Sequence, residues 1–114
     1  MASDPECLFC RIASGALPAD VVARTERVVA FRDLDPQAPV HVLVVPVDHH
    51  RDVVALAQDA ELLAEVVRAA GEVAAAECGG QHRLVWNTGE EAGQSVFHVH
   101  AHVLGGRPMG WPPG

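Results

Sequence analysis

Residues 97–103 read Phe97-His98-Val99-His100-Ala101-His102-Val103, a strict alternation of apolar residues and histidines. On a β-strand, side chains at every second position share a face, so the three histidines form a row on one side. The alternation predicts a half-buried strand over residues 96–104. The side chains expected to face the core are Phe97, Val99, Ala101 and Val103.

The histidine row calls for a chemical explanation, because solvated strand faces usually carry Thr, Lys, Glu and Arg. Imidazole offers metal ligation, or nucleophilic and acid–base chemistry near neutral pH. The segment Gly93-Gln94-Ser95 directly precedes the row; its glycine lets backbone amides approach an anion, and Ser95 adds a hydroxyl donor. Asn87, at the end of the preceding strand, can supply an amide. These neighbours favour attack on a phosphoryl group.

The remaining pattern predicts an α+β fold, with an antiparallel sheet of about five strands, one long helix and a short N-terminal helix. The loop 33–39 contains two prolines, which lack the amide that a strand needs. The tail 105–114 is too rich in Gly and Pro for regular structure. The expected elements are a helix over 7–14, strands over 21–25, 28–32, 40–45, 84–86 and 96–104, and the long helix.

The long helix is expected to begin at Asp59, a good N-cap, and to end at Gly79-Gly80. Its apolar residues recur at helical spacing and predict one buried stripe. We expect that stripe to consist of Leu63, Val66, Val67, Ala70, Val73 and Ala74.

The length, composition and net charge of the chain restrict the partners that it can bind. A length of 114 residues corresponds to a single domain over 1–114, and 49% apolar residues are enough for a core. The net charge of -7 argues against binding a nucleic acid polymer or an anionic membrane, although a few local donors suffice for one nucleotide. Without a spanning segment, and with no signal in Met1-Ala2-Ser3-Asp4, the chain is expected to be cytoplasmic.

The run His98-Val99-His100-Ala101-His102-Val103-Leu104 resembles the histidine-triad signature. Further similarity lies in residues 31–41, in Gly93-Gln94-Ser95-Val96-Phe97 and in the tail, so that the resemblance covers nearly the whole chain from Cys7. The chain is most similar to the Hint branch, the purine nucleoside phosphoramidate hydrolases, in a bacterial type with a Cys-x-x-Cys. This resemblance implies a hydrolase of AMP-like substrates that works through a covalent nucleotidyl-histidine.

The resemblance also implies catalytic roles. His100 is the expected nucleophile, and His102 is expected to bind phosphate or assist proton transfer. His41 is expected to orient His100 or to relay a proton to it. Without the resemblance, His41 is interpreted as a core histidine whose hydrogen bonds are satisfied inside the protein. Ser95 is expected to donate to the phosphate or the leaving-group atom, with a loop hydroxyl bonded to its own backbone as the alternative.

Nucleotide-binding residues follow by the same resemblance. Asp33 is expected to accept from the ribose hydroxyls, although Asp is also common before such turns. Trp111 in the tail is expected to reach the active site of a second subunit in a homodimer, with packing on its own subunit as the alternative. The base is expected against Phe9, Phe31 and Leu34, and the phosphate against Asn87, Gly93 and Gln94.

Cys7-Leu8-Phe9-Cys10 is a metal or redox spacing, and the odd total of three cysteines disfavours a disulfide framework. Zinc-bearing members of the superfamily combine such a pair with two histidines. The resemblance therefore implies a structural zinc site of Cys7, Cys10, His49 and His98, with no metal or other cofactor needed for the chemistry. The alternative is that both cysteines pack as small apolar residues.

Two other functions are compatible with the residues. A His-x-His strand can hold a catalytic zinc or iron in a metal-dependent hydrolase, although the sequence offers no obvious Asp or Glu as a further ligand near the row. A nucleotide-binding module without turnover is the other, but binding alone does not require a nucleophile.

Overall fold

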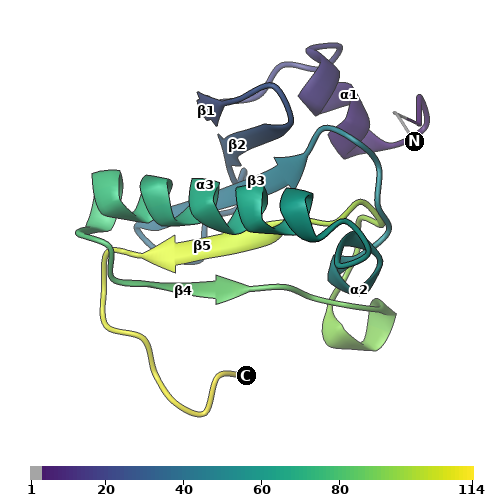
Figure 1. Cartoon of the computed structure of the whole chain (residues 1–114). Coiled ribbons are helices and arrows are strands. Elements are labelled where there is room, and N and C mark those ends of the chain that lie inside the picture. Colours follow the sequence, from purple (N-terminus) through teal and green to yellow (C-terminus); the bar gives the residue numbers. More distant parts are fainter. Residues whose placement is uncertain (1–3) are drawn as a thin grey trace.

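A computed structural model describes residues 4–114 of the chain (Figure 1). Its elements confirm the predicted α+β class. In chain order they are α1 (Leu8–Ser14), β1 (Val21–Arg24), β2 (Val28–Arg32), β3 (Val40–Pro46), α2 (Val53–Leu56), α3 (Ala60–Cys78), β4 (His82–Val85), the 3-10 turn η1 (Glu90–Ala92) and β5 (Ala101–Gly105).

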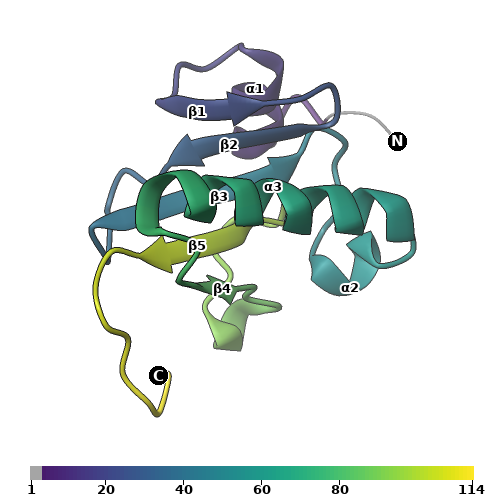
Figure 2. The same cartoon turned by 60° about the vertical axis from the view of Figure 1, so that its left-hand side comes forward.

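The five strands form one antiparallel sheet in the order β1-β2-β3-β5-β4. The long helix α3 lies across one face of the sheet, and α1 lies against the other face near β1 and β2 (Figures 1 and 2). Because both of its faces are covered, the central strand β3 is buried along its whole length. This explains why its sequence is almost continuously apolar.

The helix α3 begins and ends as predicted. The carboxylate of Asp59 accepts a hydrogen bond from the amide of Leu62 at 3.0 Å, and Gly79 ends the helix with a φ of 65°. The predicted stripe is wrong at one edge: Val67 is 44% exposed, whereas Leu62 is buried. The stripe is centred on Val66 and Ala70, and Leu62 completes its i, i+4 spacing.

A second, smaller core lies under α1. Side chains of β2 and β3 alternate between the two cores, as the period-two pattern requires. The residues of this core are Phe9, Ala13, Val29, Phe31, Leu43 and Val45.

The last strand is shorter than predicted, since β5 begins at Ala101 and not at Val96. The segment before it runs as irregular backbone, and the amide of Val99 donates to the carbonyl of His50 at 2.7 Å instead of joining the ladder with β3. Val99, Ala101 and Val103 are buried as predicted, but Phe97 is not part of the core. Its ring lies 4.5 Å from the guanidinium of Arg51.

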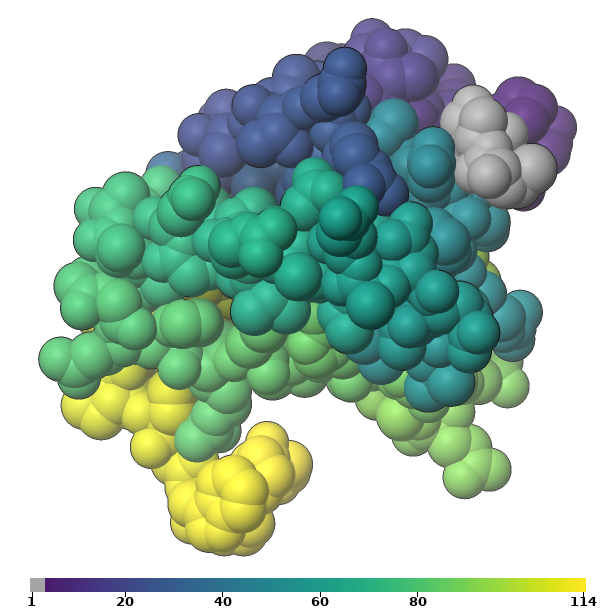
Figure 3. Space-filling view, viewed as in Figure 1, coloured from purple at the N-terminus to yellow at the C-terminus, as the bar shows by residue number. Residues whose placement is uncertain are grey.

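Other differences are confined to connections. The helix α2 and the turn η1 lie in segments for which no element was predicted, and β4 begins two residues earlier than the predicted strand at Leu84. The C-terminal segment after β5 has no regular structure and stands away from the body of the molecule (Figure 3). Within residues 4–114, we find no helix with both the length and the apolar character needed to cross a bilayer.

Candidate active site

His100 lies just before β5 and is buried. Its Nδ1 lies 2.8 Å from the carbonyl oxygen of His98. A carbonyl only accepts, so Nδ1 carries the proton and Nε2 keeps a free lone pair. Burial lowers the pKa of His100 below its usual 6.5, which favours the neutral ring. The ring is held edge-on by Phe9, with the centroids 4.9 Å apart. His100 is therefore a neutral imidazole with one nitrogen available for attack.

His41 and His102 form a chain of hydrogen bonds that sets both tautomers. The amide of Gln37 donates to Nδ1 of His41 at 3.0 Å, so the proton of His41 lies on Nε2. That proton is donated to Nδ1 of His102 at 2.9 Å, which leaves the proton of His102 on Nε2. Burial lowers the pKa of His102 to about 4, so its ring is neutral at pH 7.

Nε2 of His102 is a buried donor with no hydrogen-bond partner among residues 4–114. A buried N–H without an acceptor costs about 1–3 kcal/mol, and such groups are rare in native proteins. The rings of His102 and His100 are neighbours, with centroids 5.0 Å apart. The site thus presents a free lone pair and an unsatisfied donor side by side, which suits an electrophile bearing an anionic oxygen.

His41 was expected to act directly on His100, but in the structure its neighbour is His102. Its ring contacts His102, with centroids 5.2 Å apart, and His102 in turn contacts His100. Any relay from His41 to the nucleophile therefore runs through His102. The reason is the strand register, in which Leu43 of β3 is paired with His102 and His41 is its diagonal neighbour.

Asp33, expected from the sequence to bind the ribose, also places its carboxylate beside these histidines, a contact that the sequence did not predict. Its Oδ2 lies 3.4 Å from Nε2 of His41, and its Oδ1 accepts from the amide of Asp35 at 2.8 Å. The ligand atoms of Asp33, His41 and His102 all lie within 4.8 Å of one another. The tautomer nevertheless disfavours a metal here, because Nε2 of His41 carries a proton while Nδ1 accepts from Gln37.

A mostly apolar cavity of about 410 Å³ opens beside the row. Of the residues singled out in the sequence, Phe9, Phe31, Asp33, Leu34, Ser95, His100 and His102 line it. The side chain of Leu34 is 99% exposed, so it forms a rim and not a buried wall. Further lining residues that the sequence did not single out include Leu8, Ile12, Leu17, Leu43 and Val96. For Leu43 the signal was available, since period two places it on the face of β3 that carries His41.

Four of the expected nucleotide-binding residues, Asn87, Gly93, Gln94 and Trp111, lie outside the lining of this cavity. The buried side chain of Gln94 is used inside the protein: Oε1 accepts from the amide of Gly89, and Nε2 donates to the carbonyls of Arg51 and Val96. Gln94 thus holds the loop that carries Ser95. The amide of Asn87 lies next to Gly93, which has a φ of 99°.

Trp111, the fourth of these candidates, is 81% exposed. Its ring lies 5.8 Å from the guanidinium of Arg83, and its backbone neighbour Gly110 accepts a hydrogen bond from the same arginine at 2.8 Å. The described chain therefore leaves the indole on the surface, away from the histidine row of its own subunit.

A second cluster brings together Cys7, Cys10, His49 and His98, with all ligand atoms within 4.8 Å of one another. Nδ1 of His98 lies 3.3 Å from both sulfurs, and Nδ1 of His49 lies 3.4 Å from Sγ of Cys10. Tetrahedral zinc with ordinary bond lengths places S and N ligands about 3.6 Å apart. The spacing of the four donors therefore fits one tetrahedral ion.

The protonation of this cluster also fits a metal. Nε2 of His98 donates to the carbonyl of Pro46 at 2.8 Å, so Nδ1 faces the thiols with a free lone pair. Burial lowers the pKa of His98 to about 4 and raises the pKa of Cys10 to about 11. A bound cation would replace the protons of the cysteine thiols. It would also offset the cost of burying the thiolate of Cys10 beside His98. The amide of Cys10 donates to Sγ of Cys7, which is also the N-cap of α1.

The fold and the site together define a class: an α+β protein with three alternating histidines at the start of β5, of which His100 and His102 line an apolar cavity. The chain belongs to the HIT domain family, whose model matches residues 14–109.

Relatives match along nearly the full chain. A HIT-like protein of Synechocystis sp. is 46% identical over 111 residues, covering 96% of this chain and 97% of the relative. A HIT family hydrolase from Legionella pneumophila has a TM-score of 0.91 at 46% identity, covering 96% of this chain and 100% of that chain. A HIT family hydrolase from Clostridium thermocellum has a TM-score of 0.89 at 40% identity, with coverages of 95% and 96%.

Proposed function

We propose that the protein is a hydrolase of the Hint type, which cleaves the bond between the α-phosphorus of a purine nucleoside monophosphate and an amine. The observation that carries this proposal is the pairing of a neutral His100, with Nε2 free, and the unsatisfied Nε2–H of His102. The first is a nucleophile and the second is a donor for a phosphoryl oxygen. Two of the structural relatives are named HIT family hydrolases, which supports the same class of reaction.

The proposed substrate lies in the 410 Å³ cavity. Its base packs against the rings of Phe9 and Phe31, which contact each other edge-on with centroids 5.5 Å apart and are buried in the apolar lining. The carboxylate of Asp33 accepts from the ribose hydroxyls. The phosphoryl group then faces His100 and His102, where burial keeps both rings neutral.

In the first step Nε2 of His100 attacks phosphorus and the P–N bond to the leaving amine breaks. Ser95, at the mouth of the cavity, donates to the leaving-group nitrogen. In the second step water attacks phosphorus and the bond to Nε2 breaks, which releases the nucleoside monophosphate and restores the neutral ring. The amine takes its proton from the Ser95 hydroxyl in the first step, and the attacking water returns a proton to Ser95 in the second, so that water overall supplies the hydroxyl on phosphorus and the proton on the amine.

The test is to mix the protein with adenosine 5'-phosphoramidate, quench within one turnover and measure an adenylyl adduct by mass spectrometry. The adduct is expected on His100 and absent in His100→Ala, whereas His82→Ala, an exposed histidine on β4, is the matched control and retains it. Protein that binds AMP but forms no adduct and no AMP at stoichiometric concentration would support a binding module instead.

We further propose a structural zinc ion held by Cys7, Cys10, His49 and His98. The support is the tetrahedral spacing of the donors and the free Nδ1 of His98. All four ligand positions belong to the protein, so the ion stabilises the fold and takes no part in the chemistry. Elemental analysis is expected to find one zinc per chain, lost in Cys7→Ser/Cys10→Ser and kept in the control Cys78→Ser. Loss of turnover on chelation, with folding intact, would favour the metal-dependent hydrolase.

We also propose a homodimer, to which the tail contributes. The support is that Trp111 is 81% exposed, that Val67 of α3 is 44% exposed, and that β4 ends the sheet with an unpaired edge. Light scattering is expected to give twice the chain mass, and removal of residues 107–114 is expected to lower turnover. A monomer at micromolar concentration would refute this arrangement.

A further inference from the structure

The two cysteines of the Cys-x-x-Cys motif are placed for a reaction that the proposed zinc site does not use. The sulfurs of Cys7 and Cys10 lie within 4.8 Å of each other. The amide of Cys10 donates to Sγ of Cys7 at 3.3 Å, which orients that side chain toward Cys10. Bonded sulfurs in a disulfide are about 2 Å apart, so the two sulfurs need to approach by no more than about 3 Å. Rotation of the two side chains covers such a distance.

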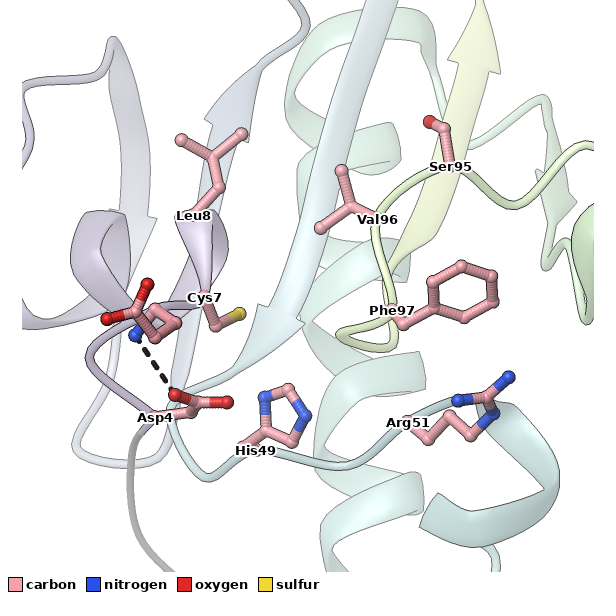
Figure 4. A pocket seen from close by; sticks show the side chains of 9 residues that line it. Asp4, Cys7, Leu8, His49, Arg51, Ser95, Val96 and Phe97 are labelled. Carbon is pink, nitrogen blue, oxygen red and sulfur yellow. Dashed lines mark hydrogen bonds between the residues drawn. The ribbon is translucent and has the colours of Figure 1, made fainter.

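A small solute reaches this pair through a second cavity, of about 470 Å³, whose lining includes Cys7 and His49 (Figure 4). Figure 4 shows the sulfur of Cys7 pointing from the start of α1 into the space beside the segment that carries Val96 and Phe97. Cys7 is half-buried, whereas Cys10 is buried. An oxidant that enters this cavity therefore meets the sulfur of Cys7 first.

The same motif holds the proposed nucleophile in place. Phe9, which lies between the two cysteines in the sequence, lines the substrate cavity and sets its ring edge-on to that of His100, with the centroids 4.9 Å apart. His98, a further member of the cluster, accepts the Nδ1 proton of His100 through its backbone carbonyl at 2.8 Å. A rearrangement of the cluster therefore acts on the ring of His100 through two separate contacts.

We propose that Cys7 and Cys10 form a redox modification site, at which oxidation to a disulfide by a peroxide lowers the activity of the site around His100. The inference rests on the proposed hydrolase and on the proposed zinc site. A metal ligand must be a thiolate, so cysteines joined in a disulfide no longer hold zinc. Because their sulfurs move toward each other and away from the histidines, Phe9 and His98 lose the support that fixes them against His100.

The oxidation has two steps. The sulfur of Cys7 attacks one oxygen of hydrogen peroxide, the O–O bond breaks, and a sulfenic acid and hydroxide are formed. The sulfur of Cys10 then attacks Sγ of Cys7, the S–O bond breaks, and a second hydroxide leaves. The two sulfurs together give up two electrons, and two protons convert the two hydroxides to water. One peroxide is thus reduced to two molecules of water for each disulfide.

The expected effect on turnover is partial, because Nε2 of His100 keeps its lone pair after the oxidation. Loss of one edge-on aromatic contact corresponds to about a two- to tenfold change, and we expect kcat/KM with adenosine phosphoramidate to fall by that factor. A metal-dependent hydrolase would instead lose turnover completely with its metal. Complete loss on chelation alone, without oxidant, would therefore overturn this inference together with the proposed function.

The experiment treats the zinc-loaded protein with hydrogen peroxide and follows three quantities besides turnover. A chromogenic chelator reports released zinc, mass spectrometry after denaturation and alkylation reports the free thiols, and the thermal shift produced by AMP reports the nucleotide site. We expect release of zinc, a disulfide between Cys7 and Cys10, alkylation of Cys78 alone and a smaller AMP shift. Dithiothreitol followed by zinc is expected to restore the starting values, which methionine oxidation would not allow.

Variants separate the disulfide from other effects of the oxidant. Cys78→Ser, at the third cysteine, is the matched control and is expected to respond to peroxide as the unmodified protein does. Cys7→His replaces one sulfur ligand by an imidazole and leaves Cys10 without a partner for a disulfide. Peroxide is therefore expected to leave its kcat/KM and AMP shift at their untreated values. Cys10→His tests the same point at the other sulfur, and thermal melting confirms that each variant is folded.

The outcomes distinguish this inference from the functions on which it rests. Thiols of Cys7 and Cys10 that both survive an excess of peroxide sufficient to oxidise free glutathione would overturn the modification site and leave the hydrolase intact. A disulfide that changes neither kcat/KM nor the AMP shift would overturn its link to His100. Absence of both turnover and an AMP shift in the reduced protein would overturn the proposed function and that link, while the mass measurement still decides whether the disulfide forms.

Discussion

His102 offers the sharpest test of the proposed chemistry, because its Nε2–H is a buried donor for which residues 4–114 provide no acceptor. Substitution by Ala removes that donor. A hydrogen bond to a charged group contributes about 1.5–3 kcal/mol, which corresponds to a loss of about 10- to 150-fold in kcat/KM. Substitution by Gln keeps an N–H donor and is expected to lose less.

The fold should tolerate both changes. In His102→Ala the proton on Nε2 of His41 loses its acceptor, but Oδ2 of Asp33 lies only 3.4 Å away and can accept it. We would measure kcat/KM with adenosine phosphoramidate, together with the thermal shift produced by AMP, which reports binding to the folded protein. If His102→Ala keeps kcat/KM within threefold and the same AMP shift, His102 does not donate to the phosphoryl group and the proposed geometry is wrong.

Three further predictions concern stability and can be checked by chemical or thermal denaturation. Gly71→Ala, inside α3 with open space at its Cβ position, is expected to stabilise the protein by about 0.5–1 kcal/mol. A Cβ on Gly105 would lie 2.6 Å from Sγ of Cys78, so Gly105→Ala is expected to destabilise it. A stabilising Gly105→Ala together with a destabilising Gly71→Ala would refute the packing at β5. Leu56→Ala, at a fully buried position of α2, is expected to cost about 2–5 kcal/mol, and a loss below 1 kcal/mol would show that α2 is not part of the core. Burial lowers the pKa of His102 in the folded state to about 4, so between about pH 6.5 and pH 4 the unfolded chain binds a proton that the folded chain does not. The free energy of unfolding therefore falls as the pH falls through this range, and His102→Gln is expected to make that dependence on pH weaker.

Local periodicity determined much of the architecture. The strands β2 and β3, the capped helix α3 and the neighbouring rings of His100 and His102 follow from patterns of period two or 3.6 within short segments. Such patterns state which side chains point the same way. They do not state where a strand begins to pair, and for that reason β5 was placed five residues too early, although Val99 was correctly expected in the core.

Only the tertiary structure decided which groups meet. His41 and His102 are 61 residues apart, and their hydrogen bond exists because Leu43 pairs with His102 in the sheet register. The tautomers of these rings depend on the backbone amide of Gln37, a group that every non-proline residue has, so no sequence pattern distinguishes it. The pocket lined by Asp4, His49 and Arg51 arises in the same way, since these residues belong to segments far apart in the sequence and come together only after the chain has folded.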